Sequence, residues 1–102
     1  MPWMEMPGAA ALEDDEIVGA ELAGRKVAVC RSQGKLFAFD NVCTHQFALL
    51  SDGFVEDGAV ECPLHQGKFD CATGKALCAP VTQAIAVYPV RAEGGRVMVD
   101  LG

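Results

Sequence analysis

Long apolar runs and aromatic residues are scarce in this sequence. Of its 102 residues, 51% are hydrophobic but only 7% are aromatic. No run approaches the roughly 18 apolar residues that a membrane helix needs, and the amino terminus has no basic segment followed by an apolar stretch. We therefore expect one domain over residues 1–102, a monomer located in the cytoplasm and without a membrane partner.

Basic residues are also few. Eight Lys and Arg stand against 14 Asp and Glu, which gives a formal net charge of -6. A surface of this sign repels a phosphate backbone. The charge balance therefore excludes nucleic acid as an expected partner.

Cysteine is present in an odd number, five, and the chain has only two histidines. In a cytoplasmic protein an odd count makes a disulfide framework a poor explanation. Cys43 and Cys62 each precede a histidine by two or three positions. The other three, Cys30, Cys71 and Cys78, have no such partner, and we expect them to act as small hydrophobic residues.

Short runs rich in Val, Ile, Phe and Tyr alternate with Gly-containing turns, which is typical of an all-β chain. Turns are expected at Ala23-Gly24, Ser32-Gln33-Gly34, Asp57-Gly58, Thr73-Gly74 and Glu93-Gly94-Gly95, where residues that tolerate positive φ occur. The predicted strands are Ile17–Leu22, Lys26–Cys30, Leu36–Asp40, Val60–Glu61, Ile85–Val90 and Arg96–Leu101. This spacing favours hairpins in a sandwich or small barrel.

Two mixed motifs carry the chemistry. Cys43-Thr44-His45 and Cys62-Pro63-Leu64-His65 each pair a thiolate with an imidazole, and sixteen residues separate them. Thiolates suit iron-sulfur clusters, and in Rieske centres two histidines replace two cysteines on one iron. We expect one 2Fe-2S cluster with Cys43 and Cys62 on one iron, and His45 and His65 on the other.

Charge counting gives this ligand set a distinct redox behaviour. Two ferric ions, two sulfides, two thiolates and two neutral imidazoles sum to zero, whereas four thiolates would give -2. A neutral site accepts an electron more easily, so the potential lies above that of plant-type ferredoxins. The added charge favours protonated imidazole, so the potential is expected to fall with pH in the alkaline range.

A mononuclear zinc site could also use two cysteines and two histidines. Structural zinc sites usually place two thiolates a few residues apart and two histidines a few residues apart. Here each loop mixes the two residue types, which favours the cluster. A zinc-stabilised interaction module remains an alternative at this point.

At the two Cys-His motifs the sequence resembles the Rieske proteins. More narrowly, it resembles the ferredoxins of bacterial aromatic-ring-hydroxylating dioxygenase systems of the naphthalene dioxygenase type. The resemblance implies a Rieske-type β-sandwich base domain and a smaller cluster-binding subdomain at about 42–80. It also implies that the ligand loops meet at an exposed tip under a third loop near Ala79-Pro80-Val81. Beyond the ligands, the similar segments are Asp40-Asn41-Val42, Ser51-Asp52-Gly53, Gln66-Gly67-Lys68-Phe69-Asp70 and the run from Thr73 to Val81.

Three positions depart from the high-potential Rieske proteins of respiratory complexes. Those proteins carry a disulfide between the ligand loops, where this chain has Ala48 and Leu64, and a serine where it has Gly67. Fewer hydrogen-bond donors to sulfur lower the potential. We expect a value near the low end of the Rieske range, about -150 mV.

The resemblance implies an electron carrier and not an enzyme. Both histidines are assigned to the cluster, so none remains for a second, mononuclear iron, and no G-x-G-x-x-G motif indicates a nucleotide site. A flavin-containing, NAD(P)H-dependent reductase would supply the electron, and a terminal oxygenase would receive it. The alternative is a carrier for another acceptor, such as an aromatic monooxygenase.

Partner docking is expected at the tip. An apolar rim is predicted from Phe47, Leu64, Gln66 and Pro80. Acidic residues near it could steer a basic partner; these are Asp52, Glu56, Asp57 and Glu61.

Overall fold

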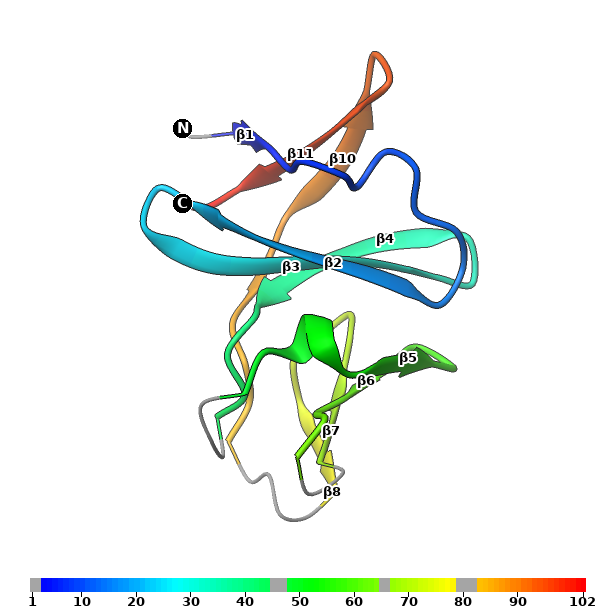
Figure 1. Cartoon of the computed structure of the whole chain (residues 1–102), viewed down its shortest axis with the longest axis vertical. Coiled ribbons are helices and arrows are strands. Elements are labelled where there is room, and N and C mark those ends of the chain that lie inside the picture. The colour runs from blue at the N-terminus through cyan, green and yellow to red at the C-terminus, as the bar shows by residue number, and fades with distance from the viewer. Residues whose placement is uncertain (1–2, 45–47, 65–66, 79–82) are drawn as a thin grey trace.

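The computed structural model describes residues 3–44, 48–64, 67–78 and 83–102, which form three antiparallel sheets and one turn of 3-10 helix, η1 (Figure 1). The sheet orders are β1-β11-β10, β2-β3-β4-β9 and β5-β6-β7-β8. The all-β prediction is confirmed. The elements are β1 (Trp3–Glu5), β2 (Glu16–Leu22), β3 (Arg25–Ser32), β4 (Lys35–Asp40), η1 (Leu50–Asp52), β5 (Phe54–Glu56), β6 (Ala59–Glu61), β7 (Lys68–Asp70), β8 (Ala76–Cys78), β9 (Val87–Tyr88), β10 (Val90–Glu93) and β11 (Arg96–Asp100).

The middle sheet, β2-β3-β4-β9, is covered on both faces. Figure 1 shows it between the sheet that holds both termini and the small sheet formed by β5 to β8. Side chains alternate between the faces of a strand, so Val27 and Val29 of β3 enter one core, whereas Ala28 and Cys30 enter the other. This explains four consecutive buried residues in β3, a pattern that one-sided sheets do not produce.

The first core lies between the middle sheet and the terminal sheet. It contains Val97, Val99 and Leu101 of the C-terminal region together with Met6 from the N-terminal region. Strand β1 joins this sheet by pairing Met4 with Val99. No strand was predicted in the first fifteen residues, because pairing with a strand at the other end of the chain leaves no local signal.

The second core lies between the middle sheet and the small sheet. Phe39 of β4 and Phe69 of β7 are fully buried there. Cys30 and Cys71 are also buried, with their sulfur atoms 3.6 Å apart. The hydrogen bond with Cys71 and burial raise the pKa of Cys30. These two cysteines fill the core as expected, whereas Cys78 is exposed.

The predicted strands agree with the structure to within one or two residues, with one exception. The range 85–90 divides into β9 and β10 at Pro89, which has no N–H to donate. Strands β5, β7 and β8 were not predicted, because the stretch from Cys43 to Pro80 mixes Gly, Pro and potential ligands with only brief apolar runs, which is typical of loops. Positive φ angles occur at Ala23, Gln33 and Asp57, each followed by a glycine with positive φ, as two-residue hairpin turns require.

Within the described ranges, no helix is long and apolar enough to cross a membrane.

Candidate metal centre

The first cysteine-histidine segment is a loop closed by backbone contacts. Val42 and Leu49 form an isolated antiparallel bridge, and the Cys43 N–H donates to the Ala48 carbonyl over 2.9 Å. The loop follows β4 and leads into η1. These contacts fix the backbone of Cys43. His45 and Phe47 lie outside the described residues.

The second segment begins at the end of β6. The Cys62 N–H donates to the Gly67 carbonyl over 2.7 Å, which draws the two ends of this loop together. Pro63 and Leu64 are exposed, and the exposed fraction of Leu64 is 45%. His65 and Gln66 lie outside the described residues.

The two loops bring Cys43 and Cys62 together in the second core. Their exposed fractions are 3% and 1%, and neither forms a disulfide. Burial raises the pKa of the Cys62 thiol, and the adjacent Cys43 side chain raises it further. The backbone N–H of Leu64, by hydrogen bonding, lowers that pKa. Two thiols from separate loops therefore face each other, and one has a backbone donor directed at its sulfur.

This arrangement fits the cysteine half of an iron-sulfur site. A bound metal displaces the thiol proton, and thiolate sulfur then accepts N–H hydrogen bonds of the kind that Leu64 provides. Among residues 3–44, 48–64, 67–78 and 83–102 no group of three or more His, Cys, Asp and Glu side chains could hold a metal ion. Both histidines of the chain lie in the gaps between these ranges.

The third loop expected at Ala79-Pro80-Val81 also lies outside the described residues. The chain that follows it is tied to the first loop, because the Thr44 hydroxyl donates to the Gln83 carbonyl over 2.9 Å. Two residues later the Ile85 N–H donates to the Gly74 carbonyl over 2.9 Å. The segment from Gln83 to Ile85 therefore joins the first loop to the turn after β7.

The acidic residues named for partner steering lie on β5, β6, η1 and the β5-β6 turn. Asp52, Glu56 and Asp57 are exposed, whereas Glu61 is half-buried. Of the four rim residues, Leu64 alone lies within the described ranges, and it is exposed.

Sequence reasoning missed one polar contact beside the first loop. Asn41 is buried, with an exposed fraction of 3%, and exchanges two hydrogen bonds with Ser51. Both residues stand in segments that resemble the ferredoxins, but residue type alone gave no indication that the two side chains meet.

The all-β fold and the buried pair of thiols together define a small β-protein with the features of an iron-sulfur protein. A family model described as "Rieske [2Fe-2S] domain" matches residues 2–89, and the chain belongs to this family. It therefore carries one Rieske-type 2Fe-2S cluster, and the zinc-module alternative is set aside.

One relative and two solved structures are similar to this chain over nearly its whole length. The naphthalene 1,2-dioxygenase system ferredoxin component of Pseudomonas aeruginosa is 48% identical over 99 residues, 97% of this chain and 95% of the relative. The structure of the Sphingomonas yanoikuyae B1 ferredoxin matches with a TM-score of 0.90 and 36% identity, over 99% of this chain and 100% of that one. A chain in the complex of reduced oxygenase and oxidized ferredoxin in carbazole 1,9a-dioxygenase matches with a TM-score of 0.88 and 31% identity, over 95% and 91%. The Rieske-type fold prediction is confirmed.

Proposed function

We propose that this chain is a one-electron carrier of an aromatic-ring-hydroxylating dioxygenase system. It accepts electrons from a flavin-containing, NAD(P)H-dependent reductase and passes them to the Rieske centre of a terminal oxygenase. The observation that carries this proposal is the likeness, over nearly the whole length of both chains, to a ferredoxin component of such a system. The similar chain in a complex of oxygenase and ferredoxin supports the choice of acceptor.

The proposed ligands are Cys43 and Cys62 on one iron, and His45 and His65 on the other. The buried pair of thiols supports the first half of this assignment. The second half rests on sequence, since each histidine follows one of these cysteines by two or three residues. When bound, the cluster supplies reversible transfer of one electron.

The protein's own contribution is a fixed frame for the sulfur atoms. The Val42–Leu49 bridge joins the two ends of the first loop, and the Cys62 N–H bond to the Gly67 carbonyl joins the two ends of the second. The Leu64 N–H stabilises negative charge on the Cys62 sulfur. A frame that holds both oxidation states without rearrangement favours fast electron exchange.

We also propose a domain organisation, an oligomeric state and a cellular location for the protein. We take residues 1–102 as one domain with a cluster-binding subdomain at about 42–80, and the protein as a cytoplasmic monomer. The separate second core beneath the small sheet supports a distinct cluster-binding part. The absence of a membrane-spanning helix among the described residues is compatible with the cytoplasm.

We propose that partners dock at the end of the molecule formed by the ligand loops. The exposed Leu64 supports an apolar contact there, and exposed Asp52 and Glu56 support attraction of a basic partner. Docking assisted by opposite charges weakens as salt screens them. Electron-transfer rates that do not change with ionic strength would remove the steering role but not the docking site.

Reconstitution tests the proposed function. Purified chain is combined with a flavoprotein reductase, NADH and the terminal oxygenase of a naphthalene-type system, and product is measured with and without the chain. We expect turnover to depend on the chain and to saturate with its concentration. Parallel assays with an aromatic monooxygenase separate the alternative acceptor. Reduction by the reductase without transfer to any of these oxygenases would contradict the proposal.

A further inference from the structure

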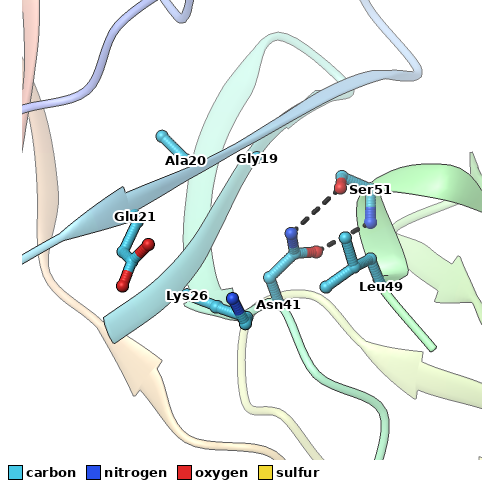
Figure 2. Close-up of a pocket in the computed structure, with 7 residues that line it drawn as sticks. All are labelled: Gly19, Ala20, Glu21, Lys26, Asn41, Leu49 and Ser51. Carbon is cyan, nitrogen blue, oxygen red and sulfur yellow. Dashed lines mark hydrogen bonds between the residues drawn. The ribbon is translucent and has the colours of Figure 1, made fainter. Parts of the chain in front are cut away.

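A buried asparagine closes the base of the first ligand loop. The Ser51 N–H donates to Asn41 Oδ1 over 2.8 Å, and Asn41 Nδ2 donates to Ser51 Oγ over 2.9 Å. Figure 2 shows these two bonds between the end of β4 and η1. Asn41 lies two residues before Cys43, and Ser51 lies beyond the far end of the loop. The amide therefore spans the loop that carries Cys43.

The backbone of Asn41 strengthens this closure. Its N–H donates to the Lys26 carbonyl of β3 over 2.9 Å, and its carbonyl accepts the Leu50 N–H over 2.7 Å. The side chain and the backbone thus join three separate parts of the fold. Buried polar groups with all partners in place specify a single local conformation.

Strand β2 has a glycine, Gly19, where it packs against the side chains of Asn41 and Ser51. A Cβ built on Gly19 would lie 2.4 Å from Asn41 Nδ2 and 2.6 Å from Ser51 Oγ. The three residues line a hollow of about 200 Å³ at this side of the molecule (Figure 2). Because φ of Gly19 is not positive, close packing and not backbone freedom explains the glycine.

From Ser51 the connection continues to the second ligand loop. Ser51 belongs to η1, and Gly53 is the C-cap of this helix. A Cβ on Gly53 would lie 1.9 Å from the Glu61 carbonyl oxygen. Glu61 directly precedes Cys62. One continuous set of contacts therefore runs from Asn41 through η1 to the residue before the second cysteine.

We propose that Asn41 is a positioning residue for the metal centre, which sets the placement of Cys43 relative to Cys62 through Ser51 and η1. This inference rests on the proposed assignment of those cysteines as cluster ligands. Asn41 itself touches neither the cluster nor a partner in this account. Groups hydrogen-bonded directly to a metal ligand typically contribute about 10- to 100-fold to metal affinity, and Asn41 acts one contact further out, through Ser51 and η1.

Three variants perturb this contact in different ways. Asn41→Ala removes both bonds, Ser51→Ala removes only the hydroxyl partner, and Gly19→Ala leaves every polar group in place but displaces the pair. The matched control is Ser32→Ala. Ser32 is the other buried polar residue among those described. Its hydroxyl accepts the Gly58 N–H over 3.0 Å at the start of β6, whereas Cys62 follows the end of that strand.

The experiment measures four properties of the purified holoproteins: the rate of iron release to a chelator, the redox midpoint potential, the electron paramagnetic resonance spectrum after reduction, and the midpoint temperature of thermal unfolding. We expect Asn41→Ala and Gly19→Ala to release iron about tenfold faster or more, with shifted potentials and altered g values. Ser51→Ala should show the same changes to a smaller extent. Ser32→Ala should lower the thermal midpoint but leave the potential and the spectrum as in the wild type.

The outcomes separate this inference from the proposed function. A wild type with a Rieske spectrum and variants that match Ser32→Ala in potential and spectrum would overturn the positioning role alone. A wild type without a 2Fe-2S signal would overturn the ligand assignment and the positioning role together. If Asn41→Ala does not fold, the milder Ser51→Ala decides the question by the same readouts.

Discussion

The backbone of Gly53 packs directly against that of Glu61. A Cβ on Gly53 would stand 1.9 Å from the Glu61 carbonyl oxygen and 3.2 Å from Cδ of Pro63. The helix η1 thereby meets the start of the second ligand loop without an intervening side chain. The spacing between the two loops depends on this contact.

Replacing Gly53 by alanine should therefore reduce cluster content. The new methyl group has to push the segment around Cys62 away from η1, because its nearest neighbours are backbone atoms and a proline ring. Iron and acid-labile sulfide per chain, measured on freshly purified protein, should fall well below the wild-type value. The control is Gly34→Ala, where φ is +79° but no atom lies within 4 Å of the new Cβ. Equal iron content in both variants would contradict this expectation.

Gly74 offers a second steric test, at the turn that contacts Ile85. Gly74 and Gly24 have nearly the same φ, +78° and +82°, but only at Gly74 would a Cβ meet a carbonyl oxygen, that of Ile85 at 2.1 Å. Gly24→Ala should cost about 1–2 kcal/mol from the left-handed conformation alone. Gly74→Ala should cost about 1–3 kcal/mol more, because overpacking is added.

Thermal unfolding scans at one heating rate compare these two alanine variants. A cost of 1 kcal/mol lowers the midpoint by roughly 4–8 °C in a domain of this size. The midpoint of Gly74→Ala should therefore lie clearly below that of Gly24→Ala. Equal midpoints would show that the Ile85 segment yields without cost.

Tyr88 provides a pH-dependent test, because it is the only tyrosine in the chain. Its hydroxyl donates to Asp40 Oδ1. Burial and the Asp40 carboxylate raise the pKa of Tyr88. Because the pKa of Tyr88 is higher in the folded than in the unfolded state, its protonated hydroxyl stabilises the fold. This stabilisation is complete below the unfolded pKa of about 10 and is lost as pH rises through the folded pKa.

Ultraviolet difference spectra between wild type and Tyr88→Phe follow the tyrosinate directly. The titration midpoint should lie above about 10, and Asp40→Asn should lower it. The extra thermal stability of wild type over Tyr88→Phe should be constant at neutral pH and shrink in strongly alkaline buffer. A midpoint at or below the ordinary tyrosine value would contradict the burial of this contact.

Four of the five cysteines form two pairs with different expected roles. Cys43→Ser and Cys62→Ser should each abolish the visible absorbance of the cluster, because each removes a proposed thiolate ligand. Cys30→Ala and Cys71→Ala should keep it, since those thiols contact each other at 3.6 Å in the second core. Loss of buried atoms should lower stability by about 1 kcal/mol. Full colour in Cys62→Ser would refute the assignment.

The sequence predicted the longer strands and the ligand loops better than the contacts between them. Short runs rich in Val, Ile, Phe and Tyr between glycine turns predicted most of the scaffold, and the Cys-His motifs predicted two loops. Strand β7 could not be found, because its three residues pair with β6 across the second Cys-His loop, for example Phe69 with Val60, and carry no local strand pattern. The Asn41–Ser51 contact depends on the absence of a side chain at Gly19, a relation that no local pattern encodes.

The most direct test of the metal centre is electron-nuclear double resonance on the reduced wild-type protein. We expect a signal from the one-electron-reduced 2Fe-2S cluster with couplings to the ring nitrogens of two histidines, His45 and His65. Each single His→Ala variant that still binds iron should lose one of the two sets of couplings. A signal without nitrogen couplings, or a colourless protein that contains zinc, would contradict this expectation.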